Sequence, residues 1–355
     1  MNTKAIDAVA TAVLYEGYML YPYRSSSVKN RQRFNFGVLY PRSYSEAQSG
    51  SDAWSMQTEF LVQAVGSPAI EVRVRFLKLI DRSVGKPIVL AASESANGAP
   101  GFETAFALEV NGRVFTPWQE AIECEVTLPA RNLDELATTP LEWKFAFPAT
   151  EDSELLRDPN PRLVGMVARK QELVEGTVEI NAVRATGGLF KVQVRVKNGS
   201  LSEGAAGQLD RNSALMRSLV SAHILLGVAE GQFVSLLEPP EDLKSLAMSC
   251  QNIGAWPVLV GGEGERDTML SSPIILYDYP QIAPESPGDL FDGTEIDEIL
   301  ALRIMTMTDD EKREMRNIDE RARRMLERTE SLPRELLMKL HGTLREPGSV
   351  REEMP

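Results

Sequence analysis

The residues with the clearest capacity for chemistry lie in a glycine-rich acidic turn, Gly261–Asp267, between two short apolar runs. Glycine-rich loops can cradle a phosphate with their backbone amides. This turn lacks the Gly-Lys-Ser/Thr ending of a phosphate loop, and the carboxylates of Glu263, Glu265 and Asp267 would repel a phosphate. We instead expect Glu265, Arg266 and Asp267 to contact a protein partner, because loops carried by rigid strands commonly hold binding groups.

A second candidate binding segment is basic, although the chain as a whole is acidic. The whole chain has a formal net charge of −13, yet residues 21–45 contain five basic residues and no acid. Aromatic residues are interspersed among them, which favours contact with an anionic protein surface. The alternative is that these bases pair internally with the surplus acids of the fold. The basic residues that we expect at a partner interface are Arg24, Lys29, Arg31 and Arg33.

The sequence lacks the common catalytic and metal-binding motifs. It has no Gly-x-Ser-x-Gly elbow and no His-Glu-x-x-His motif. Two cysteines and two histidines argue against a zinc or iron–sulfur site built within the chain. Carboxylates between Asp278 and Glu295 could gather Mg²⁺ or Ca²⁺, but their spacing matches no known loop. We therefore expect no catalytic residues, no metal site and no cofactor.

Composition narrows the classes of partner. With 43% hydrophobic and 25% charged residues, the 355-residue chain can bury a sizeable core. Its acidity, with a pI near 4.9, argues against broad nucleic-acid binding. No apolar run approaches the roughly 18 residues of a membrane span, and Asp7 and Thr11 interrupt the apolar stretch near the N-terminus, so we expect neither a span nor a signal peptide. Low cysteine usage suggests the cytoplasm.

The elements that would position these segments begin with a helix over residues 4–16, followed by strands. Ile70–Phe76 alternates apolar and charged side chains, as a strand with one wet face does. Asn111-Gly112 signals a tight hairpin, and Cys124 falls on an apolar strand face as a core thiol. Residues 148–162 read as a linker or surface loop. The other strands that we expect are Thr104–Val110, Ile122–Leu128, Leu141–Phe147, Thr177–Val183 and Leu189–Lys197.

The next part of the chain predicts alternating helices and strands. Asn212–Glu230 has a helical apolar stripe that includes His223, which we interpret as a core histidine rather than a catalytic base. A strand from Gln232 to Leu237 and a short helix from Pro240 to Cys250 follow. Two apolar runs bounded by glycine and proline, Trp256–Val260 and Pro273–Tyr277, then predict buried strands on either side of the acidic turn.

The last part of the chain predicts helices. Helix-start signals occur at Thr294 and at Thr308, which forms a capping box with Glu311. From Asp309 to Arg328 there are seven acids and seven bases beside a narrow apolar stripe. Such a helix packs on its own domain or on a partner helix.

Together these patterns predict an α+β chain. It would have an antiparallel β-sandwich-like N-terminal region, a small mixed α/β element and C-terminal helices. The divisions that we expect are an N-terminal helix and basic-aromatic segment (1–50), a β-rich domain (51–200), a mixed α/β region (201–290) and a helical tail (291–355).

Three stretches of the sequence carry a family resemblance: Tyr23–Arg33, Gly264–Asp292 and Thr294–Leu300. Through them the chain resembles a family of uncharacterised bacterial proteins that are encoded beside oxygen-tolerant nickel–iron hydrogenases of the actinobacterial type. The resemblance implies an accessory, assembly or interaction role around a hydrogenase. It supplies no site residues, and genomic neighbourhood is an association rather than a mechanism.

Three functions follow from these observations. The first is a non-catalytic accessory or assembly protein that binds a protein partner, with a hydrogenase subunit or maturation factor as the suspected partner. The second is a hydrolase or small-ligand-binding protein that uses carboxylates of the Asp267–Asp292 region with Arg266 as an anion clamp. The third is a structural homo-oligomer formed through the C-terminal helices.

Overall fold

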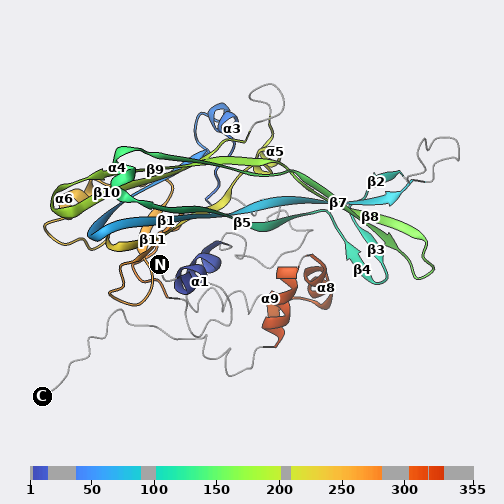
Figure 1. Ribbon diagram of the computed structural model, residues 1–355. Helices are drawn as coiled ribbons and strands as arrows, with labels where there is room; N and C mark the ends of the chain where they lie inside the picture. Colours follow the sequence, from blue (N-terminus) through green and yellow to red (C-terminus); the bar gives the residue numbers. More distant parts are fainter. Residues whose placement is uncertain are drawn as a thin grey trace, which may run out of the picture.

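The computed structural model describes residues 3–14, 37–88, 101–200, 209–281, 304–318 and 320–331. This part of the chain is mostly antiparallel β-sheet with few helices (Figure 1). One sheet contains eleven strands, and a separate hairpin contains two. The expectation of a β-rich chain is thus confirmed.

A single strand of 33 residues, β1 (Ser55–Pro87), runs through the large sheet. It pairs with five other strands in turn, always antiparallel. No single shorter strand could form hydrogen bonds with all the backbone groups of β1, so several segments that are distant in sequence pair with it. Its neighbours are β10 (Leu189–Asn198), β11 (Val220–Val234), β5 (Trp118–Asn132), β8 (Leu163–Gln171) and β2 (Phe102–Thr104).

β1 and β11 share an irregularity that divides β1 into two halves. Their pairing shifts between Ala64 and Ala69, opposite Gly231 and Ala229. Glu230 has φ +51° there, and its carboxylate accepts a hydrogen bond from the Ser67 amide at 2.8 Å. A bulge of this kind bends both strands and increases their twist.

The main hydrophobic core collects one face from each half of β1. Phe60 and Val62 come from the first half, and Val74 and Phe76 come from the second. They meet buried residues of β5, β9 (Val174–Arg184), β10 and β11 in one cluster. Phe60 packs edge-on against Phe233 with ring centroids 5.5 Å apart.

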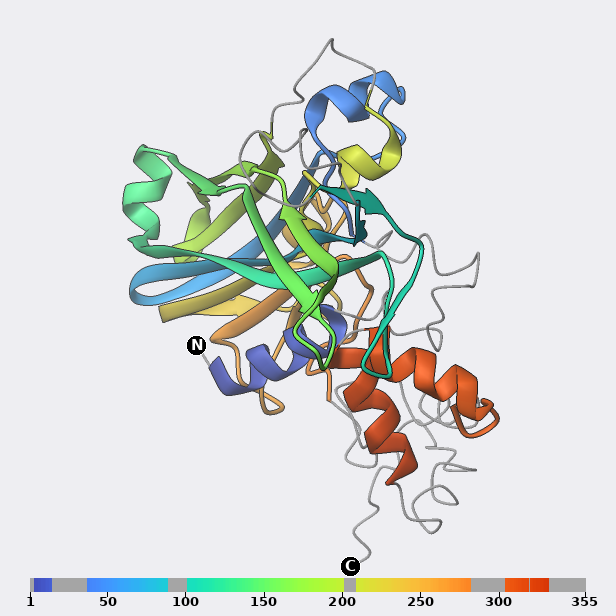
Figure 2. The same cartoon turned by 90° about the vertical axis from the view of Figure 1, so that its right-hand side faces the viewer.

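The remaining strands extend the sheet on both sides. From one edge to the other, its main path runs β12 (Trp256–Leu259), β13 (Thr268–Ser272), β11, β1, β10, β9 and β6 (Leu141–Phe147). At the far end of β1, β8 pairs with β7 (Thr150–Arg157), and a small hairpin joins β3 (Leu108–Val110) to β4 (Arg113–Phe115). Figure 1 shows these strands projecting from the body, and Figure 2, which faces their ends, shows them near the red helices.

Helices cover parts of the outer faces. α1 (Thr3–Leu14) packs Ile6, Val9 and Val13 against Leu225 and Leu270 of the sheet. Apolar residues of the tail helices α8 (Asp309–Ile318) and α9 (Glu320–Glu330) join a cluster with β1 and β5. The shorter helices are α3 (Arg42–Ala47), α4 (Leu133–Thr138), α5 (Arg211–Leu215), α6 (Lys244–Met248) and the 3₁₀ turn η2 (Thr186–Gly188).

The predicted helix Asn212–Glu230 is wrong. Only Arg211–Leu215 is helical, and Val220–Val234 is strand β11. β11 lies between β1 and β13, with the main core on one face and α1 against the other. Because residues 220–228 are all buried, the two-residue alternation of a strand is absent and a helical stripe fits by coincidence.

Three other local predictions differ from the structure. Residues 150–157 are strand β7 rather than linker, because an exposed edge strand can be as acidic as a loop. Thr104–Val110 divides into β2 and β3. β13 ends at Ser272, so Pro273–Tyr277 is not a strand, which fits a proline that lacks an amide donor.

Several local predictions are confirmed. Leu141–Phe147 is β6, Asn111 and Gly112 have the positive φ values of a tight hairpin turn, and Cys124 is buried. The Thr308–Glu311 capping box forms, with the Thr308 amide 2.7 Å from Glu311 Oε2. The predicted helix start at Thr294 lies outside the described residues.

Two findings concern the organisation of the whole chain. The large sheet takes strands from both sides of the expected boundary at residue 200, and the four divisions stay a prediction. Within the described ranges, no helix has the length and apolar character needed to cross a membrane.

Substituting Phe60 tests the shared core. Phe60→Ala should lower the free energy of unfolding by about 3–5 kcal/mol, because a fully buried ring at the junction of β1 and β11 leaves a cavity. Urea unfolding followed by tryptophan fluorescence measures the loss. Val183→Ala, at a side chain that is 63% exposed on β9, is the matched control and should change stability by less than about 0.5 kcal/mol.

Candidate functional site

The loop between β12 and β13 contains the predicted contacts Glu265, Arg266 and Asp267. Gly261 and Gly264 have φ values of +129° and +89°, which side-chain-bearing residues rarely adopt. They let the Glu265 side chain fold back over the loop, where Oε2 accepts a hydrogen bond from the Gly262 amide at 3.0 Å. The Glu265 carboxylate therefore stabilises the turn itself.

The backbone of the same loop is bound to β11. The Phe233 amide donates to the Arg266 carbonyl at 2.7 Å, and the Val228 amide donates to the Asp267 carbonyl at 2.9 Å. Partial burial opposes ionisation of Asp267, but the hydroxyl of Thr268, 2.7 Å away, helps to lower the pKa of that carboxyl below its usual value. The Arg266 side chain is exposed.

The structure thus brings together three of the seven predicted contact residues. Arg24, Lys29, Arg31 and Arg33 lie outside the described residues. Their expected role at an interface stays a prediction.

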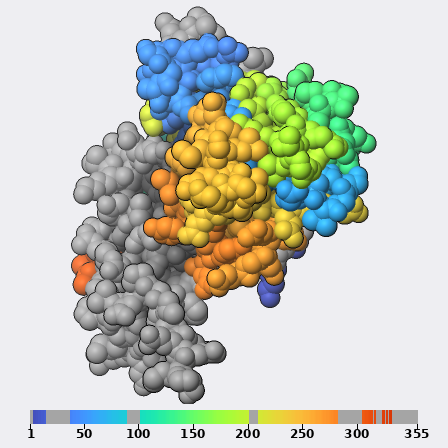
Figure 3. Space-filling model, turned by 90° about the vertical axis from the view of Figure 1, so that its left-hand side faces the viewer, coloured from blue at the N-terminus to red at the C-terminus, as the bar shows by residue number. Residues whose placement is uncertain are grey.

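Large apolar side chains on either side of the loop are exposed, which the sequence patterns did not indicate. Ile253 is 57% exposed, Trp256 40%, Ile275 72% and Tyr277 87%. Trp256, Ile275 and Tyr277 belong to the two runs predicted as buried strands, and the apolar character of those runs did not indicate that these members are exposed. We name these four residues the apolar patch. Residues from this part of the chain, yellow to orange, share one face in Figure 3.

A cavity of about 350 Å³ lies next to the patch residue Trp256. Met56, Pro273 and Tyr40 are among its other lining residues. Burial raises the pKa of Tyr40 to about 12, against the opposing effect of Arg211, so this phenol stays protonated at neutral pH. Asp52 and Arg211 also line this cavity and form an ion pair of 3.6 Å with each other, beside the apolar side chains of Met56 and Trp256.

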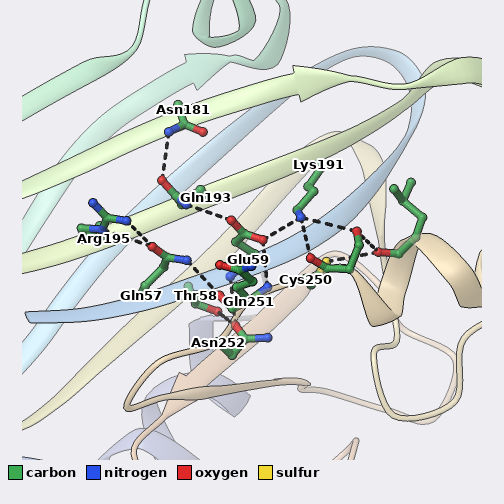
Figure 4. Close-up of polar contacts among 12 residues, drawn as sticks. Gln57, Thr58, Glu59, Asn181, Lys191, Gln193, Arg195, Cys250, Gln251 and Asn252 are labelled. Carbon is green, nitrogen blue, oxygen red and sulfur yellow. Dashed lines mark hydrogen bonds and ion pairs between the residues drawn. The ribbon is translucent and has the colours of Figure 1, made fainter.

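A polar network holds the segment that precedes Trp256 (Figure 4). Glu59 on β1 is its centre: its carboxylate accepts hydrogen bonds from Gln193 at 2.8 Å and from the Gln251 amide at 2.8 Å, and pairs with Lys191 at 2.7 Å. The side-chain oxygen of Asn252 in turn accepts a hydrogen bond from the Glu59 backbone amide at 2.9 Å. The segment 249–253 is therefore fixed across β1 and β10.

The backbone continues this attachment. Gln57 and Ile253 exchange amide–carbonyl hydrogen bonds, both of 2.9 Å. The Ile253 side chain nevertheless remains exposed, and Trp256 follows three residues later at the start of β12. The network thus presents apolar groups on a rigid backbone, as interface anchors require.

A second cavity, of about 460 Å³, is charged. Asp81 and Glu172 line it together with Lys170 and Arg217. Both cations contact Glu172, at 2.8 Å and 3.0 Å, and the hydrogen bond from Lys170 is the main cause that lowers the pKa of Glu172. Surrounding protein atoms raise the pKa of Asp81, although its side chain is exposed. The protonated form of Asp81 is therefore favoured relative to that of an ordinary aspartate, although Lys170 opposes the shift.

Of the carboxylates expected in the second function, Asp267 and Asp278 are engaged in hydrogen bonds, and Glu285, Asp289 and Asp292 lie outside the described residues. Asp278 accepts hydrogen bonds from Ser235 at 2.5 Å and from the Leu259 amide at 2.8 Å. Neither Asp278 nor Arg266 lines the cavities described above. Among the residues that the structure describes, no three His, Cys, Asp or Glu side chains gather as a metal site would need.

His223 is buried in the sheet, in agreement with the core interpretation. It is 0% exposed, and its Nδ1 lies 2.7 Å from the Ser221 carbonyl oxygen. Burial, with a smaller contribution from Arg75, lowers the pKa of His223 to about 4. The imidazole is neutral at pH 7.

Comparison with known proteins adds no family. No protein-family model matches the chain, and no curated protein matches it.

Replacing Glu59 tests whether the network holds segment 249–253. Glu59→Gln should lower the free energy of unfolding by about 2 kcal/mol at pH 7, because Lys191 and the Gln251 amide lose an ionised acceptor. The pKa of Glu59 is lowered despite burial, through its hydrogen bonds, so this stabilisation exists above the usual glutamate pKa and is lost as pH falls below it.

Denaturant unfolding at pH 7 and at acidic pH measures both effects. The difference between wild type and variant should shrink in acid. Glu46→Gln, which breaks an exposed ion pair with Arg42, is the matched control and should cost less than about 1 kcal/mol. Equal losses for the two variants would contradict a central role for Glu59.

The buried imidazole predicts a second pH effect. Because the folded pKa of His223 is below its ordinary value of 6.5, the unfolded state takes up the proton first as pH falls. Between pH 6.5 and 4 wild type should lose about 3 kcal/mol that His223→Leu does not lose. An identical loss in His223→Leu would refute the assignment.

Proposed function

We propose that the chain is a non-catalytic accessory protein that binds a protein partner through the apolar patch Ile253, Trp256, Ile275 and Tyr277. The observation that carries the proposal is the exposure of these four side chains, two of which, Ile253 and Trp256, lie on or shortly after the segment 249–253 that the Glu59 network fixes. Grouped exposed apolar residues commonly mark interaction sites, and tryptophan and tyrosine are frequent binding anchors.

The charges around the patch fit a polar rim. Glu265 is engaged within the loop, and Thr268 donates a hydrogen bond to Asp267. The exposed Arg266 is the member of the predicted trio most suited to contact a partner, since arginine is enriched at interfaces. The apolar groups supply most of the affinity in this proposal, and the charges supply orientation.

The family resemblance of the sequence supplies the proposed partner. A hydrogenase subunit or one of its maturation factors would bind the patch in the cytoplasm. The four basic residues between Arg24 and Arg33 would add contacts to an anionic region of the same partner.

We also propose the finer fold class. The meeting of both halves of β1 in one core supports a sandwich-like arrangement of the sheet. Together with α1 and the tail helices, it supports the α+β class.

The two alternatives have unequal support. The charged cavity at Asp81 favours a small-ligand or hydrolase function, but at a place other than the expected Asp267–Asp292 region. For a homo-oligomer formed through the tail, Met315 and Leu326 are already buried in a cluster with Leu77 and Leu79 of β1. Those apolar residues are engaged within the chain.

A pull-down from the native host tests the proposed function. The double variant Trp256→Ser/Tyr277→Ser should capture at least about tenfold less of the partner than wild type, because two anchors are lost. Val183→Ser, which also removes an exposed apolar side chain, is the control and should capture as much as wild type. Unchanged capture by the double variant would contradict the patch.

The identity of the captured protein is a separate outcome. Recovery of a hydrogenase subunit or maturation factor supports the proposed partner. A patch-dependent partner of another kind would keep the binding surface and reject the hydrogenase association.

A further inference from the structure

β6 lies at one end of the large sheet with one edge open. It pairs with β9 from Leu141 opposite Ile180 to Phe147 opposite Val174, and with no other strand among the described residues. The side chains of Glu142 and Lys144 are 56% and 80% exposed, so the outer face of the strand is accessible at these positions. An open edge offers amide and carbonyl groups to another strand.

Two of the other strands that pair on one side only, β12 and β7, carry features that discourage pairing. β12 contains Pro257, which has no amide donor, and is four residues long. β7 carries three like charges, on Glu151, Asp152 and Glu154, which would repel a second copy of the same strand. β6 has neither proline nor a run of like charges, and Trp143, Phe145 and Phe147 give it high strand propensity.

The chain also fixes the shape of β6. The buried Lys78 ammonium donates to the carbonyls of Phe147 at 3.3 Å and Pro148 at 2.6 Å, where the strand ends. The Phe145 ring lies directly on Gly176 of β9, where a Cβ would collide with it. An edge held in this way loses little conformational freedom when another strand binds.

The side-chain pattern of β6 is complementary to itself in one register. Facing residues of antiparallel strands lie on the same side of the sheet. If Trp143 faces its own copy, Glu142 faces Lys144 of the second strand twice, and Leu141 faces Phe145. Registers centred on Glu142 or Lys144 place a charge opposite itself.

We infer that β6 of one molecule pairs with β6 of a second copy about a twofold axis at Trp143. The two sheets then become continuous, with aromatic and aliphatic pairs on the inner side and two Glu142–Lys144 ion pairs on the outer side. Like charges directly opposite each other destabilise paired strands, which selects this register. The interface is separate from the apolar patch, so it does not rest on the proposed function.

Sedimentation velocity of the full-length protein over a range of micromolar concentrations tests the inference. Wild type should show a concentration-dependent monomer–dimer equilibrium. Glu142→Lys or Lys144→Glu alone should weaken dimerisation at least about tenfold, because each places like charges opposite each other twice. The exchange Glu142→Lys/Lys144→Glu restores opposite charges and should return the dissociation constant close to that of wild type.

Each result decides for or against the pairing. A wild-type protein that stays monomeric at all concentrations refutes it, as does a dimer that neither single variant weakens or that the double exchange fails to restore. Because both side chains are exposed, thermal unfolding of each variant should match wild type, which separates loss of pairing from loss of folding. Glu263→Lys, an equally drastic charge reversal at an exposed residue of the β12–β13 loop at the other end of the sheet's main path, is the matched control and should not alter dimerisation.

Discussion

The backbone pairing of β1 is the constraint on which the rest of the structure depends. Thirty-three consecutive residues of extended chain present amide and carbonyl groups on two edges, and buried backbone groups must be paired. Strands from residues 102 to 234 provide this pairing. The bend shared with β11 near Ala64 then lets one strand contribute to both sides of one core.

β1 also positions the candidate surface. Polar residues of β1 and β10 are used to hold segment 249–253, and a desolvated carboxylate at Glu59 is tolerated because three donors satisfy it. The segment is thereby fixed by polar contacts, so its apolar side chains remain available. In the β12–β13 loop, Glu265 and Asp267 likewise accept hydrogen bonds from within the loop and from Thr268. The side chain of Arg266 between them is exposed.

Sequence patterns predicted those elements whose two faces differ in polarity. β6 and β10 alternate apolar and polar residues, so their strands could be located, and the capping residue Thr308 located α8. β11 was not predicted as a strand because both of its faces are buried. β7 was not predicted because almost all of it is exposed. The exposed Trp256 and Tyr277 could not be foreseen, since exposure depends on neighbours contributed by distant segments.

The long separation between β1 and β11 has a consequence for synthesis. Val72 pairs with Leu226, so more than a hundred residues must be made after β1 before that partner exists. Closing such long loops is slow, and the edge of β1 that pairs with β11 lacks its partner until residues 220–234 have been made. During synthesis the central strand can therefore pair along one edge, with β5 and then β10, before β11 completes the other edge.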